Sequence, residues 1–303
     1  MLTITEWAKL NPTPLASGVV EIFANNNPVL ALMPFANVAG NSYRYNREEA
    51  LPGIAFRDFN EGYVESTGVI NPETEKLTII GGDSDYDVAQ IKMGVGSNDT
   101  RAIHDAMKAK ALSLAWLKTF FHGNTNDNAK AFDGLNVRVT GDQVLTAGTN
   151  GGTLTFAMLD ELIDAVSGGT DAIFLNKRLI RDYRALLRTA PGNVAETIMV
   201  PNFGQPAITY NGVPLLPIEE GADGNPILPF NETQGSATTT SSIYAVRFAP
   251  DALSGIQTGP IDVRDLGEID AKPAYRTRVE WYSGLCIKHP RAVARLKGVK
   301  AAA

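Results

Sequence analysis

The sequence lacks most of the residues from which disulfides, metal centres and membrane spans are built. Among its 303 residues it has one cysteine, Cys286, and three histidines. A single cysteine excludes an intramolecular disulfide, and so few soft ligands speak against a Cys/His metal site, so we expect Cys286 to be a packed thiol. No run of about 18 apolar residues occurs, and the N-terminus has no basic segment ahead of an apolar core. We therefore expect no membrane span, no secretory signal and a protein that is soluble inside the cell when made.

Catalytic signatures are missing as well. The sequence contains no G-x-S-x-G, no phosphate-binding P-loop and no H-E-x-x-H. Asp83, Asp85 and Asp87 alternate along an expected strand, so their carboxylates share one face. A calcium loop does not fit, because Val88 stands at its glycine position and Gly94 at its bidentate acid. A solvated strand face or an intersubunit salt-bridge strip fits better, and we expect no catalytic residue, no cofactor and no metal.

Neither sign of charge dominates the chain. The 27 lysines and arginines against 33 acidic residues give a net charge of −6. That balance speaks against a uniformly basic coat for nucleic acid and leaves room for a local patch. With 44% hydrophobic residues, a chain of this length can bury a large core in one domain or two.

One long helix, over residues 99–121, is expected to organise the molecule. At about 1.5 Å per residue it would span roughly 34 Å, against a radius of gyration of about 19 Å for a compact chain of this length. The subunit should therefore be elongated and plate-like. The expected buried face carries apolar residues in steps of three and four: Ile103, Met107, Ala111, Leu114, Leu117 and Phe121.

The chain ahead of this helix divides into two unusual segments. Residues 1–40 are broken by prolines, with one short helix expected at 16–24, yet they are rich in apolar side chains. This pattern predicts an extended arm packed on its own domain or on a neighbouring subunit. Residues 41–92 form two strands around a long, charged middle with many glycines and prolines, a loop that is marginal alone and is expected to lie on another subunit.

The remaining chain alternates helices and strands without an internal repeat, which indicates an α+β fold. Asn211-Gly212 is a hairpin turn signal, and residues 221–242 have the composition of a mobile loop. Helices are expected at 156–166 and 177–189, and strands at 172–175, 208–210, 213–216, 243–248, 261–264, 274–281 and 285–287.

The order and spacing of five segments resemble the HK97-fold major capsid proteins of tailed bacteriophages. These segments are Phe132-Asp133-Gly134-Leu135, the strand and cap at 171–176, Tyr210-Asn211-Gly212-Val213-Pro214-Leu215, residues 242–248 and the ending 278–292. The resemblance implies an N-terminal arm (1–40), an extended loop with peripheral strands (41–92), a spine helix (93–130), an axial domain (131–260) and C-terminal strands that return to the peripheral and axial domains (261–303).

The resemblance also implies a function and partners. Copies of the chain would form hexamers and pentamers of an icosahedral virion capsid that encloses double-stranded DNA without sequence-specific binding. The start at Met1, without a long charged helical segment, predicts a separate scaffolding protein; a portal and cement proteins are further expected partners, with assembly in the host cytoplasm. Lysine–asparagine crosslinking, known in some relatives, is not expected, because no motif defines a partner for Lys76.

We expect neighbouring subunits to touch apolar residues of the arm and charges of the loop and spine helix. The residues are Trp7, Phe23, Phe35, Arg44, Arg47, Arg57, Glu61, Glu65, Arg101, Lys108 and Lys110. The loop charges would pair with opposite charges on an adjoining spine helix or on peripheral strands. Two alternatives stay open: an encapsulin-type shell around cargo enzymes, which shares the fold, and a soluble α+β ligand-binding protein or enzyme.

Overall fold

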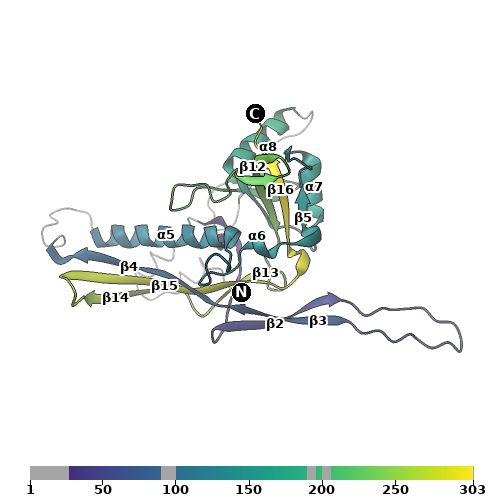
Figure 1. The fold of residues 1–303 in the computed structure, drawn as a ribbon, viewed down its shortest axis with the longest axis horizontal. Helices are drawn as coiled ribbons and strands as arrows, with labels where there is room; N and C mark the ends of the chain where they lie inside the picture. Colours follow the sequence, from purple (N-terminus) through teal and green to yellow (C-terminus); the bar gives the residue numbers. More distant parts are fainter. Residues whose placement is uncertain (1–26, 90–99, 190–195, 200–205, 303) are drawn as a thin grey trace.

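The computed structural model describes residues 27–89, 100–189, 196–199 and 206–302. These residues form a long lower layer, an upper body above it, and a hairpin, β2–β3, that projects away from both (Figure 1). The expected helix at 16–24 and the expected contacts Trp7 and Phe23 lie outside the described residues. The elongated outline is the one that the long helix predicts.

The lower layer, in the described part of the chain, is a five-stranded sheet around one long strand, β15 (Ala274–Ile287). β15 pairs antiparallel with β4 on one side and with β13 and β14 on the other, and β1 adds parallel to β13. The sequence predicts two strands here, but Ser283 and Gly284 stay in register opposite Gln257 and Ile256, so the strand is continuous. The other strands are β1 (Phe35–Asn37), β4 (Thr78–Asp87), β13 (Leu253–Gln257) and β14 (Asp262–Glu268).

The spine helix α5 (Thr100–His122) lies along this sheet (Figure 1). Trp116 packs on Trp281 of β15, with ring centroids 5.7 Å apart, and its Nε1 donates to Ser283 Oγ at 3.2 Å. The predicted buried face is wrong in the first half of the helix, where Ile103 and Met107 are 47% and 63% exposed.

In the first half of α5, Asp105 and Ala109 are buried instead. Farther along, Leu117 and Phe121 are buried as predicted, and Leu112, Ser113, Trp116 and Phe120 are buried beside them. The rings of Trp116 and Phe120 bury more apolar area than the side chain of Leu114 could. Packing therefore rotated the face away from the simple apolar stripe.

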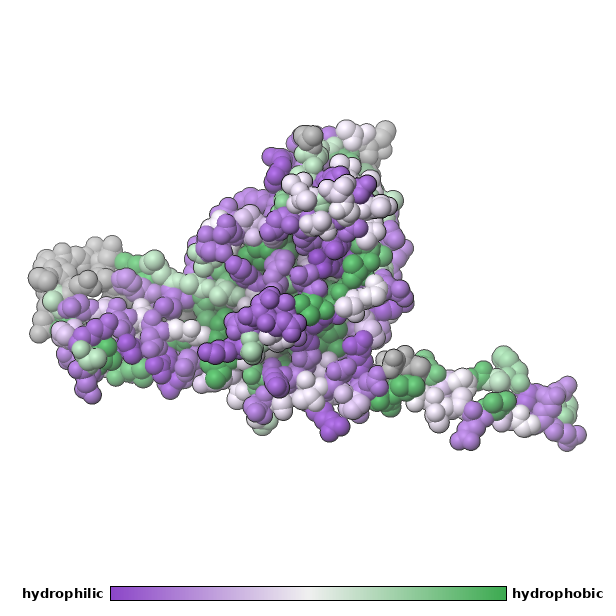
Figure 2. All heavy atoms as spheres, in the orientation of Figure 1, coloured by the Kyte–Doolittle hydropathy of each residue, from purple (hydrophilic) through white to green (hydrophobic). Residues whose placement is uncertain are grey.

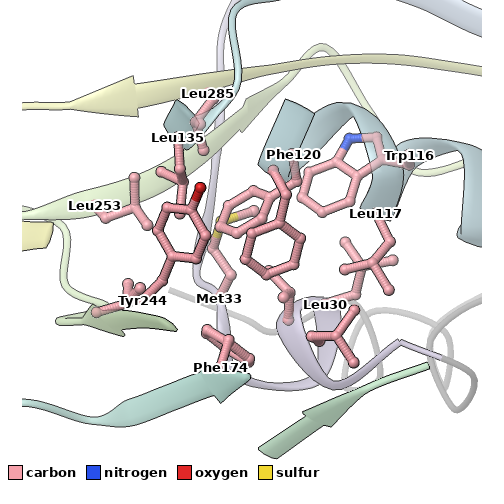
Figure 3. Packing of buried hydrophobic residues seen from close by; sticks show 14 of the residues in the cluster. Leu30, Met33, Trp116, Leu117, Phe120, Leu135, Phe174, Tyr244, Leu253 and Leu285 are labelled. Atoms are coloured by element: carbon pink, nitrogen blue, oxygen red, sulfur yellow. The ribbon is translucent and has the colours of Figure 1, made fainter. Parts of the chain in front are cut away.

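The end of the predicted arm belongs to the core of its own subunit. Asn27 caps the short helix α3 (Pro28–Leu32) by accepting from Val29 N and Leu30 N, and its Nδ2 donates to Ser113 O at 3.3 Å. Leu30 and Met33 are fully buried between α5 and residues of both sheets (Figure 3). The core thus joins the lower layer to the upper body.

The prediction that Phe35 contacts a neighbouring subunit is wrong, because Phe35 is buried in its own subunit. It is 5% exposed, and its ring lies 5.3 Å from Trp281 and 6.2 Å from Trp116. A Cβ added at Gly255 would overlap the same ring, so the ring fills the space that the glycine leaves. No neighbour can reach this side chain without unpacking the subunit.

The upper body is a nine-stranded sheet in the described residues, in the order β5–β16–β12–β7–β10–β9–β8, with β6 beside β16 and β11 beside β12. Helices α7 (Phe156–Asp164) and α8 (Lys177–Thr189) pack on the face that holds Ile173 and Leu175, whereas Phe174 faces the core under α5. This alternation is the two-residue period of a strand. The strands are β5 (Val144–Thr146), β6 (Gly152–Thr153), β7 (Ala172–Asn176), β8 (Glu196–Met199), β9 (Pro206–Tyr210), β10 (Val213–Ile218), β11 (Glu232–Gln234), β12 (Ala237–Val246) and β16 (Val293–Lys300).

The segment predicted to be a mobile loop, 221–242, is instead anchored in this body. Ile227 and Leu228 are buried, and Leu228 O accepts from Asn176 Nδ2 at 2.6 Å. The Ser/Thr-rich stretch enters β12, where Thr240 Oγ1 donates to Glu232 O at 2.8 Å. Hydroxyls that donate to backbone carbonyls and to the Glu232 carboxylate inside the sheet account for a loop-like composition without a loop.

Candidate assembly surfaces

Among the described residues, the most exposed large apolar side chains lie at the tip of the projecting hairpin. β2 (Ser42–Ala50) and β3 (Val69–Lys76) pair antiparallel, and residues 51–68 continue beyond them without strand structure. Ile54, Phe56 and Phe59 are 97%, 107% and 93% exposed, and hydrophobic residues follow the projection in Figure 2. Apolar side chains gathered on a free loop indicate a surface that another molecule covers.

The charged side chains of the tip form hydrogen bonds within the tip. Asp58 N donates to Glu61 Oε2 at 3.1 Å, and Arg57 Nη1 donates to Glu61 O at 3.2 Å. The Arg57 guanidinium also lies 5.2 Å from the centroid of the Tyr63 ring. Two of the expected contact residues, Arg57 and Glu61, therefore shape the turn that presents the apolar residues, while Glu65 is exposed beside it.

The base of the hairpin is clamped to the body. Arg138, from the short helix α6 (Leu135–Arg138), makes a two-pronged ion pair with Glu75, with Nη2 to Oε2 at 2.7 Å. Both side chains are about one-sixth exposed, at 16% and 17%. From the other strand of the hairpin, β2, Tyr45 OH donates to Ile287 O of β15 at 3.1 Å. These contacts set the direction in which the loop projects.

A small cavity of about 190 Å³ lies at this base, lined by Arg47, Glu73 and Glu75 among others. Arg47 is half-buried there, whereas Arg44 is exposed on the hairpin. Cys286 is buried nearby, and burial raises the pKa of its thiol to about 11, as expected for the packed thiol that the sequence predicts.

The expected contacts on α5 differ in their surroundings. Lys110 is exposed, and Lys108 lies over β4, where a Cβ at Gly82 would come within 3.4 Å of its Nζ. The side chain of Arg101 lies outside the described residues. Ile103 and Met107, which the sequence pattern predicts to be buried, lie exposed on the surface of α5.

Asp83 and Asp85 of β4 are paired inside the subunit, which corrects the alternative of an intersubunit strip, while both side chains stay partly exposed and Asp87 is exposed. Arg278 Nε donates to Asp83 Oδ1 at 2.7 Å, and Arg276 Nε donates to Asp85 Oδ1 at 2.6 Å. Lys272 adds an ion pair to Asp85 at 2.8 Å. These hydrogen bonds hold the pKa of both carboxyls below the usual range of an aspartate. The cross-strand register of β4 and β15 places each pair opposite one another.

Two kinds of site are absent from the part of the chain that the structure describes. No group of three or more histidine, cysteine or acidic residues lies close enough there to hold a metal ion. No described helix combines the length and apolarity that a membrane span requires. The exposed apolar or charged surfaces of the described residues are thus the loop tip, the stripe of Ile103 and Met107 on α5, and the helices α7 and α8 of the upper body.

Known proteins share this architecture. The family model described as Major capsid protein GP7 matches residues 12–159, which include the arm, the loop and the spine helix. In structure, the chain is similar to the capsid of the native GTA particle, with 13% identity, coverage of 92% of this chain and 90% of that chain, and a TM-score of 0.64. Residues 12–159 thus match a family of major capsid proteins, and the chain has the HK97 fold.

Two further similar structures are a phage protein and an encapsulin. A protein of Mycobacterium phage Bobi is 13% identical over 91% of both chains, with a TM-score of 0.65. The encapsulin of the holo-SrpI complex from Synechococcus elongatus PCC 7942 is 18% identical over 91% of this chain and 88% of that chain, with a TM-score of 0.66. No curated protein matches the sequence. The predicted fold and family are confirmed, and the family model favours the capsid over the encapsulin.

Proposed function

We propose that this chain assembles into hexamers and pentamers of an icosahedral shell around phage double-stranded DNA, with the loop tip of each subunit covered by a neighbour. The observation that carries the proposal is the hairpin tip, where Ile54, Phe56 and Phe59 are exposed on a projection that has no core of its own. Burying one such side chain contributes about 1.5–3 kcal/mol. A shell is the assembly that covers this surface on every copy.

The shape of the subunit supports the same conclusion. A thin lower layer with a long projection can touch several neighbours, and each contact can be modest because many of them act together. A repeated head-to-tail contact closes into rings, which are the units of a shell. The net charge of −6 suits a wall that encloses DNA without gripping it. The capsid function needs no catalytic site.

Expression of the full chain, followed by sedimentation and electron microscopy, tests this function. We expect rings, sheets or closed shells in the wild-type protein. Substituting Phe56→Ser and Phe59→Ser should leave a folded subunit and remove the large particles. A compact monomer or dimer from the wild-type protein would contradict the proposal, as would unchanged shells from the double variant.

An encapsulin-type shell is the second candidate, because an encapsulin is among the similar structures. The two functions differ in what the particle holds. Particles isolated from the cells that naturally produce them should carry nuclease-protected DNA if the chain is a phage capsid protein. Co-purifying protein cargo without protected DNA would identify an encapsulin-type container.

A separate scaffolding protein, a portal and cement proteins stay predictions about partners, as does assembly in the host cytoplasm. Expression of the chain alone bears on the first of these. If a scaffolding protein directs curvature, the isolated chain should form sheets or aberrant shells, and adding the scaffold should restore closed particles of one size.

A further inference from the structure

Helix α8 presents a stripe of positive charge. Lys177, Arg181, Arg184 and Arg188 follow at steps of four, three and four, so they share one face, and all of them are exposed, as is Arg178 beside them. The opposite face of the helix, with Leu179, Ile180 and Tyr183, is buried on the sheet. The basic stripe therefore faces solvent in the isolated subunit.

Part of this stripe is already engaged inside the subunit. Lys177 Nζ forms an ion pair with Glu219 Oε1 at 2.6 Å, and the Arg178 guanidinium lies 5.1 Å from the Phe230 ring centroid. No carboxylate among the described residues forms an ion pair with Arg181, Arg184 or Arg188. Arg181 and Arg184 instead line an open groove of about 1040 Å³ between α8 and β10.

Helix α7 carries the opposite charge. Asp160, Glu161 and Asp164 are exposed on it, and α7 itself contains no basic residue. Asp160 accepts from Tyr210 OH at 2.7 Å, which leaves Glu161 and Asp164, three residues apart, as the acidic pair that α7 presents.

The two helices lie over opposite halves of one sheet face. α7 packs on β16 and β12, whereas α8 packs on β7 and β10, farther along the strand order. A head-to-tail contact between copies would bring the α8 half of one sheet toward the α7 half of the next. Contacts of this kind join two different patches and close into rings.

We propose that the basic stripe of α8 docks against the acidic residues of α7 on the next copy of this chain in each ring of the shell. The inference deepens the proposed function and rests on it. Charge complementarity between two patches of the same chain identifies the partner as a second copy, and repulsion between like charges would reject a reversed approach. DNA, the other ligand that an arginine stripe can bind, becomes an outcome of the test.

Charge reversal and its compensation test the proposal in the full chain. The first variant carries Arg181→Glu and Arg184→Glu, the second carries Glu161→Arg and Asp164→Arg, and the third combines all four substitutions. Each of the first two should lower the fraction of subunits in particles by about tenfold or more, since small losses repeat at every contact of a ring. The third variant should return that fraction to near the wild-type level.

Matched controls separate docking from folding. Lys130→Glu reverses an exposed charge in the turn after α5 and should assemble normally. Circular dichroism and thermal unfolding should be alike for all variants before assembly. Failure of the fourfold variant to assemble, with its fold intact, would overturn the docking. Normal shells from the first variant that no longer retain DNA would overturn it too, by assigning the stripe to nucleic acid.

A mixture of the first two variants gives a sharper result. Each variant has lost the charge complementarity between its own α7 and α8 patches, so a subunit of one should pair preferentially with a subunit of the other. The mixture should form alternating rings, which close with six subunits and not with five, and hence sheets or tubes without closed shells. Closed shells from the mixture would contradict the docking. A wild-type protein that forms no particles would instead contradict the proposed function.

Discussion

Arg138 and Glu75 join the projecting hairpin to the rest of the subunit through side chains that are largely buried. Removing one partner would leave the other charge buried without its counter-ion. We predict that Arg138→Leu lowers the free energy of unfolding by about 3 kcal/mol, measured by urea denaturation. Lys177→Met, which breaks an exposed pair with Glu219, should leave the unfolding midpoint unchanged. Equal effects of the two substitutions would contradict the clamp.

The ion pairs of Asp83 and Asp85 predict how the free energy of unfolding depends on pH. Their pKa values are lower in the folded chain than the 3.8 of a free aspartate, so the unfolded chain binds protons first as the pH falls. The stability that these pairs contribute is present above about pH 4 and is lost below it, toward the depressed folded pKa. The free energy of unfolding of the wild-type protein should fall more between pH 4 and pH 2 than that of Asp85→Asn. An identical fall in both proteins would show that the pair contributes nothing.

At the residue scale, the sequence predicts whether a side chain is buried better than it predicts which residues that side chain contacts. Cys286 was predicted to be packed, and it is buried. Phe35 was assigned to a neighbouring subunit, because nothing in the sequence shows that Gly255, far along the chain, leaves a space for its ring. The sequence predicts the loop charges as contacts, whereas Arg57 and Glu61 bond within the tip and the aromatic side chains beside them are the exposed ones.

At the scale of elements, α5 has one face in the core and one exposed apolar stripe. Ile103 and Met107 contribute little to the packing of the subunit, so a role in assembly would explain their exposure. We predict that Ile103→Ser with Met107→Ser leaves the free energy of unfolding nearly unchanged and weakens particle formation.

Trp116→Ala is the contrasting substitution on the same helix. It removes a fully buried ring from the core and should cost about 3–5 kcal/mol of the free energy of unfolding. If the Ile103/Met107 variant loses as much stability as this one, the exposed face of α5 has been assigned incorrectly.

Local signals predicted several elements well. The bounds of α8 are those that the sequence predicts, and Asn211 and Gly212 adopt the positive φ of the expected hairpin turn, at 50° and 77°. The rotated face of α5 and the burial of 227–228 depend on segments far away in sequence, which local periodicity does not report. The arginine stripe of α8 is visible in the sequence, but its acidic counterpart becomes evident only when the sheet places α7 and α8 over the same face.

At the scale of the whole molecule, the described residues form one packed body with one projection. A continuous core joins α3 and α5 to strands of both sheets (Figure 3), so the lower layer and the upper body are held together. The hairpin tip lies outside this core and can be altered without disturbing it. The central claim, that the tip exists to be covered by an adjacent subunit, can therefore be tested separately from folding.

The most direct test replaces residues 51–68 with Asn-Gly, which closes the hairpin between Ala50 and Val69, paired in the native register. Analytical ultracentrifugation would compare this variant with the wild-type protein, with thermal unfolding as the check on the fold. We predict a folded subunit that sediments as small species while the wild-type protein forms particles. Particles of wild-type size and yield from the shortened protein would contradict the account.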